Sequence, residues 1–285
     1  MEKKKLSASE PSVGGAKTSW DKVAWWYDTL LQGEGTYQKD LILPNLLRLV
    51  EPKKNEVILD LACGQGFFSR EFAKKGARVI GADISKELIA IAKKNSSKTI
   101  TYYLAAADRL SFVSERSVDV ITLILALQNI ENVQDVLNEC KRVLKPDGEL
   151  HIVMNHPAFR VPKGSSWGWD PSASSGQAPS TSLKAGEKGV QYRRIDSYLS
   201  ESKEKIQMHP SASSGRTLKP QDYTTSFHRP LQYYFKAIQK AGLFVARLEE
   251  WSSHKKSEPG LRAKAENIAR AEIPLFLYFG VRKHI

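Results

Sequence analysis

The residues best suited to chemistry in this sequence are two aspartates on either side of a glycine turn. Asp60 ends one apolar run, Gly64 and Gly66 follow it, and Asp83 ends the next apolar run. A carboxylate can accept hydrogen bonds from the paired hydroxyl groups of a ribose. A carboxylate beside a glycine turn also repels a pyrophosphate and favours a ligand with a cationic or amino end. The pattern therefore predicts a site for a nucleoside cofactor with such an end, rather than for a dinucleotide.

The elements around these aspartates are those expected of a doubly wound sheet. Residues 57–59 are a short apolar run typical of a strand buried on both faces. Residues 67–75 follow with helical spacing, and residues 78–82 predict a second strand. In such a sheet, ligands bind outside the carboxyl ends of the strands at the topological switch point. We therefore expect Asp60, the glycine turn and Asp83 to face one crevice.

The same periodicity predicts the remaining elements. Further strands are expected at residues 100–104, 118–125, 150–154, 243–251 and 273–281. Further helices are expected at residues 19–31, 36–50, 133–143, 230–241 and 258–272, and after Ser85 as an N-cap. Gly148 is expected to start a turn into the fifth strand.

Four motifs in this order resemble class I S-adenosylmethionine (SAM) methyltransferases of the small-molecule, type 11-like kind. They are DLACGQG at residues 60–66, GADIS at 81–85, Ala107-Asp108 after the third strand, and RVLKPDGEL at 142–150. The family usually has two glycines where this chain has Asp147-Gly148. The spacing of Trp20-Asp21, Ala24 and Tyr27-Asp28 resembles the family's N-terminal lid helix.

The resemblance implies a Rossmann-like, doubly wound α/β sheet of seven strands, with N-terminal lid helices and an insertion after strand five. The last strand would insert antiparallel between strands five and six. The cofactor would be SAM, with Asp83 on the ribose, Asp60 at the amino end of the methionine moiety and Asp108 near the adenine. The implied cofactor-binding residues are Tyr27, Asp60, Ala62, Cys63, Gly64, Gly66, Asp83, Ile84, Ala107, Asp108 and Leu125.

The acceptor side is predicted from residues near the fifth strand and the insertion. His156 and His228 are candidate catalytic bases, since an unperturbed histidine pKa of about 6.5 suits neutral pH. The alternative for each is a loop histidine hydrogen-bonded to the backbone. Candidate substrate residues are Trp26, Asn155, Trp167 and Trp169. No metal is expected, because the histidines and cysteines show no ligand spacing.

Composition limits the class of protein. The chain has 285 residues, 41% of them hydrophobic, which is enough for one large domain with an appended lid. Two cysteines are too few for a disulfide framework, and residues 1–17 lack the apolar core of a signal peptide. No apolar run is long enough to span a bilayer. These features predict a cytoplasmic protein; they leave its oligomeric state open.

The chain is expected to divide into five parts. They are a disordered tail at residues 1–17, lid helices at 18–55, a SAM-binding Rossmann core at 56–155, an insertion at 156–229 and a C-terminal completion of the sheet at 230–285. The insertion contains the hexapeptide PSASSG twice, at residues 171–176 and 210–215. Such small residues cannot bury a core, so both copies are expected to be flexible surface loops.

The favoured function is methyl transfer from SAM to a small, partly aromatic or apolar acceptor by in-line displacement. Residues 126–130 resemble the matching segment of quinone-biosynthesis C-methyltransferases, with Gln128 where those carry arginine. The formal net charge of +12 suggests an RNA methyltransferase as the alternative, although the basic residues are scattered. A SAM-binding regulator without catalysis is a third possibility, and an NAD-dependent enzyme is a remote fourth.

Overall fold

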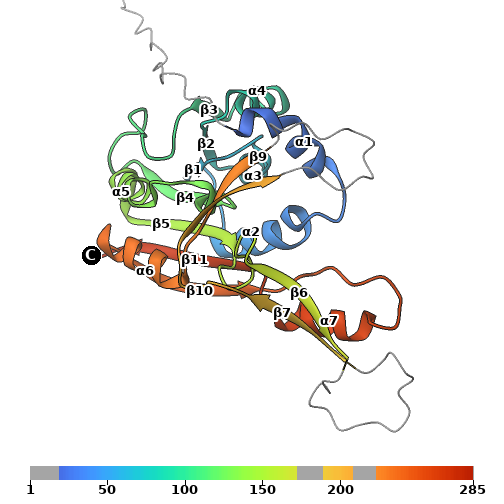
Figure 1. Ribbon diagram of the computed structural model, residues 1–285. Helices are drawn as coiled ribbons and strands as arrows, with labels where there is room; N and C mark the ends of the chain where they lie inside the picture. Colours follow the sequence, from blue (N-terminus) through green and yellow to red (C-terminus); the bar gives the residue numbers. More distant parts are fainter. Residues whose placement is uncertain (1–18, 172–188, 208–222, 285) are drawn as a thin grey trace, which may run out of the picture.

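The computed structural model of the chain describes residues 19–171, 189–207 and 223–284 (Figure 1). In these residues one seven-stranded sheet has the strand order β10-β11-β5-β4-β1-β2-β3. β11 pairs antiparallel with both β10 and β5, whereas the pairs β5-β4, β4-β1, β1-β2 and β2-β3 are parallel. The predicted Rossmann-like sheet is confirmed, and its last strand, β11, lies antiparallel between β5 and β10, the fifth and sixth strands of the prediction.

The sheet strands are β1 (Val57–Leu61), β2 (Arg78–Asp83), β3 (Thr101–Leu104), β4 (Val118–Ile124), β5 (Leu144–Asn155), β10 (Leu243–Trp251) and β11 (Phe276–Lys283). The α-helices are α1 (Trp20–Gln32), α2 (Leu43–Val50), α3 (Phe67–Lys74), α4 (Lys86–Asn95), α5 (Val133–Val143), α6 (Leu231–Lys240) and α7 (Ala263–Glu272). A π-helical segment, η1 (Gln38–Ile42), leads into α2, and a 3₁₀ turn, η2 (Leu127–Asn129), follows β4.

Two apolar layers hold helices against the two faces of the sheet. One layer joins buried residues of α5 and α6 to β1, β4, β5 and β11. The other joins α2, α3 and α4 to the opposite face of the sheet. Alternate residues of one strand enter opposite layers: Ile58 lies in the second and Leu59 in the first. A sheet covered on both faces explains why β1 and β4 are almost continuously apolar.

The largest errors in the predicted element boundaries are at β5 and α7. β5 begins at Leu144 rather than at residue 150, because Leu144 pairs with Val118 and the next pair is Glu149 with Val120. The residues of the predicted turn bulge out between these two pairs. Gly148 is needed there, since a Cβ would lie 2.7 Å from the Asp119 carbonyl oxygen. α7 begins at Ala263 rather than at residue 258, because the chain turns after Pro259.

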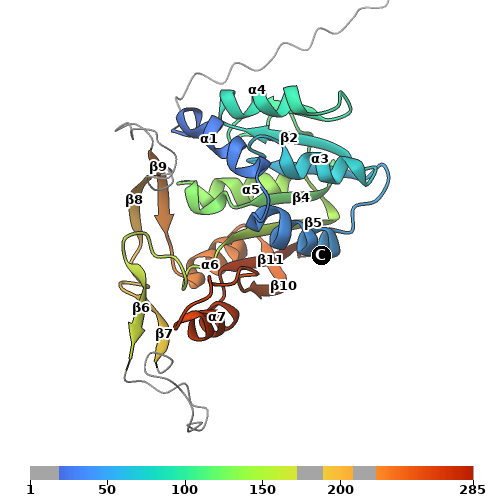
Figure 2. The same ribbon diagram turned by 90° about the vertical axis from the view of Figure 1, so that its right-hand side faces the viewer.

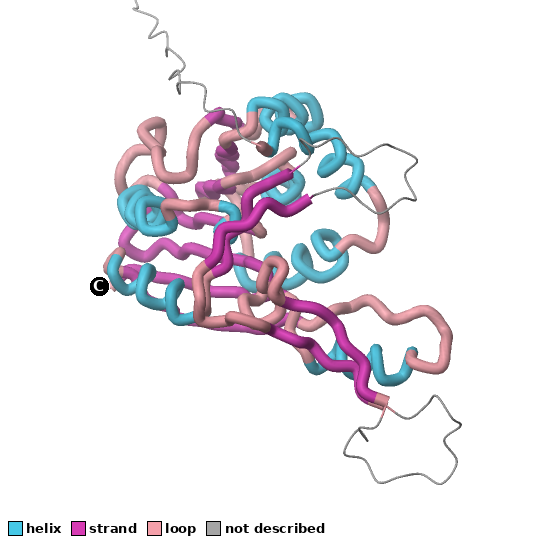
Figure 3. Tube along the Cα trace, in the orientation of Figure 1, coloured by secondary structure: helices cyan, strands magenta, loops and turns pink. Residues whose placement is uncertain are grey.

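The insertion after β5 contains strands that the sequence analysis missed. β6 (Ser165–Asp170) pairs antiparallel with β7 (Val190–Ile195), and β8 (Ser202–Gln207) pairs antiparallel with β9 (Tyr223–His228). Figures 2 and 3 show the two hairpins along one side of the molecule, beside the central sheet. β9 packs against η2, and β7 packs against α7. The predicted tail and both PSASSG repeats, apart from Pro171, lie outside the described residues.

None of the helices in the part of the chain that the structure describes has the length and apolar character needed to cross a membrane.

Candidate functional site

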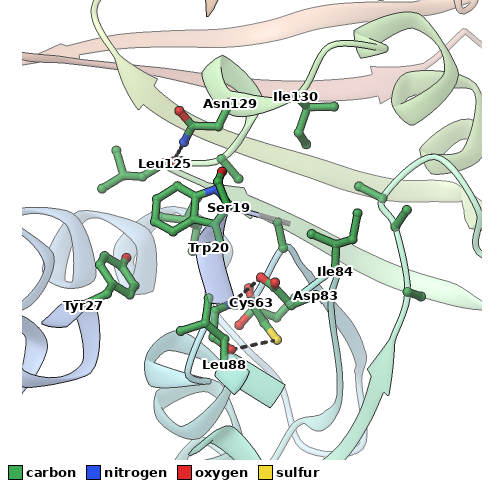
Figure 4. Close-up of a pocket in the computed structure, with 18 of the residues that line it drawn as sticks. Ser19, Trp20, Tyr27, Cys63, Asp83, Ile84, Leu88, Leu125, Asn129 and Ile130 are labelled. Carbon is green, nitrogen blue, oxygen red and sulfur yellow. Dashed lines mark hydrogen bonds between the residues drawn. The ribbon is translucent and has the colours of Figure 1, made fainter. Parts of the chain in front are cut away.

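A cavity of about 300 Å³ lies where the carboxyl ends of β1, β2 and β4 meet under α1 (Figure 4). This is the switch point at which a doubly wound sheet binds its ligand. In the view of Figure 4, Trp20 of α1 is drawn between Asp83 and Cys63 on one side and Leu125 and Asn129 on the other. The described lining residues are Ser19, Trp20, Tyr27, Leu31, Asp60, Ala62, Cys63, Gly64, Phe67, Phe68, Asp83, Ile84, Leu88, Ala105, Ala106, Ala107, Asp108, Ile124, Leu125, Ala126, Asn129, Ile130, Glu131, Asn132 and Thr225.

The carboxylate of Asp83 is fixed at the end of β2 by two backbone donors. The Gly64 amide donates to its Oδ2 at 2.9 Å, and the Ser85 amide donates to its Oδ1 at 2.8 Å. Each carboxylate oxygen has a further lone pair to accept another hydrogen bond. Asp83 is only 7% exposed, and burial raises its pKa to about 6 despite these donors. The side chain is therefore held rigidly, with acceptor capacity left for a ligand in the cavity.

Asp60 is the second buried carboxylate of the cavity. Its Oδ2 accepts a hydrogen bond from the Ser69 hydroxyl at 2.5 Å, and its Oδ1 accepts one from the Thr122 hydroxyl at 3.1 Å. Burial raises its pKa to about 6, and the nearby charge of Asp83 adds to the rise. Among the described residues, no ion pair within 4 Å involves either aspartate. A cationic ligand would supply the opposite charge that the described side chains do not.

The turn between β1 and α3 places backbone against the cavity. Gly64 and Gly66 have φ values of 57° and 77°, a left-handed conformation that glycine adopts at little cost. A Cβ on Gly66 would lie 2.4 Å from the Tyr102 hydroxyl oxygen, so a larger residue would not fit there without rearrangement. Ala62 and Leu125 also have positive φ values, 55° and 54°, and both line the cavity. Left-handed non-glycine residues are uncommon and cluster at functional sites.

Helix α1 covers the cavity with aromatic side chains. The rings of Trp20 and Tyr27 meet edge to face at 6.0 Å between centroids. Burial raises the pKa of the Tyr27 hydroxyl to about 12, so Tyr27 is neutral at physiological pH. The helix is attached to the β2–α4 junction, since the Ser85 hydroxyl donates to Asp21 at 2.6 Å. Ser85 in turn accepts from the Leu88 amide as the N-cap of α4, as the sequence predicted.

Replacing Asp21 with alanine should loosen this attachment. We expect the affinity for S-adenosylhomocysteine to fall about fivefold, the equivalent of about 1 kcal/mol, because the lost bond acts on the ligand only through the position of α1. Isothermal titration calorimetry measures the change. Asp28→Ala is the matched control, because Asp28 lies on the same helix and bonds only Gln32 within it at 2.8 Å. Equal affinities for the two variants would contradict the role assigned to Asp21.

The far end of the cavity is formed by the segment after β4 and by β9. Arg229, at the end of β9, donates to the carbonyl oxygens of Ile130 at 3.0 Å and Glu131 at 2.8 Å. Its guanidinium also stacks on the rings of Phe227 and Tyr233. Arg229 is only 5% exposed, so it acts as a buried connection between the insertion and the cavity wall.

Replacing Arg229 with alanine would leave the two carbonyl oxygens without their donor. We expect the free energy of unfolding to fall by about 2 kcal/mol, in the range measured for hydrogen bonds to charged groups. Urea denaturation followed by circular dichroism measures this change. Arg194→Ala is the control, because Arg194 is exposed and its ion pair is with Asp196 on the surface. A loss no larger than that of the control would show that the connection does not stabilise the fold.

The structure brings together most of the residues predicted to bind the cofactor. All of them line the cavity except Gly66, which starts α3 behind the turn. The residues predicted for the acceptor do not join them. Trp26, Trp167 and Trp169 are not among the lining residues, and Asn155 and His228 border a separate cavity of about 20 Å³.

The two candidate catalytic histidines are not among the residues that line the cavity, and both have hydrogen-bond partners elsewhere. His156 lies in the loop after β5, close to the alternative that the sequence left open, whereas His228 is the last residue of β9 rather than a loop residue. His156 accepts a hydrogen bond from the Ala158 amide, and its Nε2 lies 2.8 Å from the Glu250 carboxylate. Burial lowers its pKa, and Glu250 partly opposes this. His228 Nε2 lies 2.7 Å from the Tyr198 carbonyl oxygen. Neither histidine is among the lining residues. The proposed mechanism therefore uses neither of them.

Several lining residues were not predicted. Trp20 had a usable signal, because it lies seven residues before Tyr27 and so shares its helix face. Asn129, Glu131 and Asn132 lie in an irregular segment after β4, and Thr225 belongs to a strand that was itself missed. The described side chains also contain no group of three or more His, Cys, Asp or Glu residues that could hold a metal ion.

Comparison with known proteins agrees with this geometry. Residues 59–152 match the family described as "Methyltransferase domain". Residues 59–152 are therefore a class I SAM-dependent methyltransferase domain. The cofactor of the domain is SAM, as the sequence predicted.

Curated relatives of the methyltransferase domain come from quinone biosynthesis. The chain is 37% identical over 105 residues to the demethylmenaquinone methyltransferase of Tropheryma whipplei, covering 36% of this chain and 43% of the relative. It is 33% identical over 133 residues to the ubiquinone/menaquinone biosynthesis C-methyltransferase UbiE of Zymomonas mobilis, covering 45% and 54%. The chain thus matches about half the length of these relatives.

Solved structures share the fold beyond the methyltransferase domain. A SAM-dependent methyltransferase from Mesorhizobium loti aligns with a TM-score of 0.63 at 22% identity, covering 87% of this chain and all of the other. The [4+2]-cyclase SpnF aligns with a TM-score of 0.57 at 14% identity, covering 94% and 97%. Since the second is named as a cyclase, the fold alone does not decide the reaction.

Proposed function

We propose that this protein transfers the methyl group of SAM to a small-molecule acceptor. The observation that supports this best is the pair of buried carboxylates, Asp60 and Asp83, beside the glycine turn. Both are less than 10% exposed and lack an ion-pair partner within 4 Å in the described chain. A buried, unpaired carboxylate is costly, so a ligand that brings positive charge and hydroxyl groups is the natural occupant.

We assign the two ends of this one cavity to the two ligands, SAM and the methyl acceptor. Asp83 would accept the ribose hydroxyls, Ala107 and Asp108 would border the adenine, and Asp60 with the Gly64 turn would face the methionine moiety. This leaves the part between Trp20, Leu125 and the segment Asn129–Asn132 for the acceptor. We keep the division into a SAM-binding core at residues 56–155 and a substrate region at residues 156–229 as a proposal. It is supported on the acceptor side only by Thr225, the one described residue of the insertion that lines the cavity.

When bound, SAM supplies an activated methyl group that needs only a nucleophilic atom in line with the breaking carbon–sulfur bond. The task of the protein is then to align two ligands and exclude water. The aromatic cover of α1 and the apolar wall at Ile124 and Leu125 suit this task. With His156 and His228 outside the cavity, we propose alignment rather than a histidine base as the main contribution to the rate.

Quinone methyltransferases are named among the relatives, and we include a quinol among the acceptors to be tested. The proposed RNA alternative has less support, because no lysine, arginine or histidine is among the described residues that line the cavity.

The direct test is a screen of metabolite extracts with SAM carrying a deuterated methyl group, followed by mass spectrometry. We expect at least one small molecule to gain the labelled methyl group with the wild-type protein and not with Asp83→Ala. Recovery of the label only in RNA would favour the alternative. Binding of SAM without transfer to any fraction would favour a non-catalytic SAM-binding protein.

A further inference from the structure

The acceptor end of the cavity carries a consistent charge pattern. The described residues that line the whole cavity include the acidic residues Asp60, Asp83, Asp108 and Glu131, but no lysine, arginine or histidine. This contrasts with the chain as a whole, whose formal net charge is +12. The described lining of this cavity thus contains no basic side chain, although the chain as a whole is basic.

Two basic residues that contact the wall of the acceptor end are already paired. The Lys203 ammonium lies 2.9 and 3.0 Å from the two carboxylate oxygens of Glu131. The Arg229 guanidinium donates to the Ile130 and Glu131 carbonyl oxygens and is only 5% exposed. Lys203 pairs with Glu131 at the exposed surface and Arg229 is bonded to the backbone of the wall, and neither is among the described residues that line the cavity.

The rest of the acceptor end is uncharged. Trp20, Leu31 and Ile130 offer apolar surface, while Asn129, Asn132 and Thr225 offer neutral polar groups. The Asn129 amide nitrogen donates to the Leu125 carbonyl oxygen at 3.3 Å, which directs its Oδ1 away from that bond as an acceptor. Such a surface can bind rings and accept hydrogen bonds from hydroxyl or amino groups. It offers no charge to compensate a carboxylate, sulfonate or phosphate that leaves water.

We propose that the site selects its acceptor by charge, taking a neutral or cationic apolar molecule and rejecting an anionic one. This rests on the proposed function, because it concerns the acceptor of the same site. The proposal also predicts that the natural acceptor has no free acidic group near the ring that enters the cavity. An acidic group would have to be esterified or far from that ring.

A matched pair of fluorescent probes tests the selection without knowledge of the acceptor. N-phenyl-1-naphthylamine is neutral, and 8-anilinonaphthalene-1-sulfonate has the same ring system with one sulfonate added. Each is titrated against full-length protein saturated with S-adenosylhomocysteine, whose binding is first measured by calorimetry. Thr225→Trp fills the acceptor end, so only the fluorescence lost in that variant is counted as binding in the cavity. This subtraction removes sulfonate bound to the basic surface.

We expect the neutral probe to bind in the cavity at least tenfold more tightly than the sulfonate. Thr225→Arg, which places a cation at the same position, should reduce that ratio by at least fivefold. Equal or tighter binding of the sulfonate would overturn the proposal. So would a neutral probe that does not bind, or one whose binding Thr225→Trp leaves unchanged. Failure of the proposed function can be told apart from failure of this proposal. The methyl-transfer screen would then be negative, while the ratio of neutral-probe to sulfonate affinity would stay at tenfold or more.

Discussion

Replacing Asp83 with alanine is expected to lower the affinity for S-adenosylhomocysteine at least about 100-fold. Asp83 is fixed by the Gly64 and Ser85 amides with a lone pair on each oxygen still available. Two charge-assisted hydrogen bonds to the ribose, at about 1.5–3 kcal/mol each, account for a loss of this size. Calorimetric titration measures the affinity directly.

Two variants separate loss of the ligand contact from loss of the fold. Asp83→Asn keeps the shape of the side chain and should fall between wild type and Asp83→Ala. Asp119→Ala removes a carboxylate at the other end of the sheet, where Asp119 bonds the Val57 amide and Lys145. That variant should lose stability but keep its affinity. An Asp83→Ala protein with unchanged circular dichroism and wild-type affinity would refute the assignment.

Lowering the pH from 7 to 5 is expected to weaken SAM binding by about 10- to 100-fold. Burial raises the pKa of both Asp60 and Asp83 to about 6 in the unliganded protein. Both must be deprotonated to face the cation and accept from the ribose, and at pH 5 each is ionised in only about one molecule in ten. The fraction with both groups ionised therefore falls by more than this factor but by less than its square, because the charge of Asp83 itself raises the pKa of Asp60 and the two groups titrate together.

The effect on stability has the opposite sign. A carboxyl group whose folded pKa lies above its unfolded value of 3.8 binds protons more tightly in the folded state. Its contribution to the stability of the unliganded protein is present below about pH 4 and lost as the pH rises through about 6. The thermal shift caused by SAM should therefore grow between pH 5 and 7. Asp60→Asn should flatten the pH profile, and a wild-type affinity independent of pH over this range would contradict the account.

The sequence could predict that Asp60, Gly64 and Asp83 line one cavity because these residues are close together in the chain. Asp60, Gly64 and Asp83 belong to one strand–turn–helix–strand unit, whose geometry follows from local rules. The parallel sheet then places them at a common edge whatever the remaining chain does. Strand order is not a local property. The antiparallel position of β11 between β5 and β10 was therefore predicted only from the family resemblance.

The acceptor side depends on contacts between distant segments. Thr225 reaches the cavity because Arg229 bonds the carbonyl oxygens of Ile130 and Glu131. Neither the hairpin that carries Thr225 nor this connection has a short-range sequence signal. The histidines were attractive candidates because of their chemistry, but His156 follows β5 in a direction that leads to Glu250 instead of the cavity. Residue type alone could not distinguish these two environments.

We expect two buried carboxylates beside a glycine turn to make a site that binds a nucleoside with an amino end and excludes a diphosphate. Calorimetric titration of the full-length protein with S-adenosylhomocysteine and with NAD, at pH 7 under identical conditions, tests it most directly. We predict micromolar or tighter binding of S-adenosylhomocysteine and no measurable heat of binding with NAD. Binding of NAD together with no binding of S-adenosylhomocysteine would contradict the account.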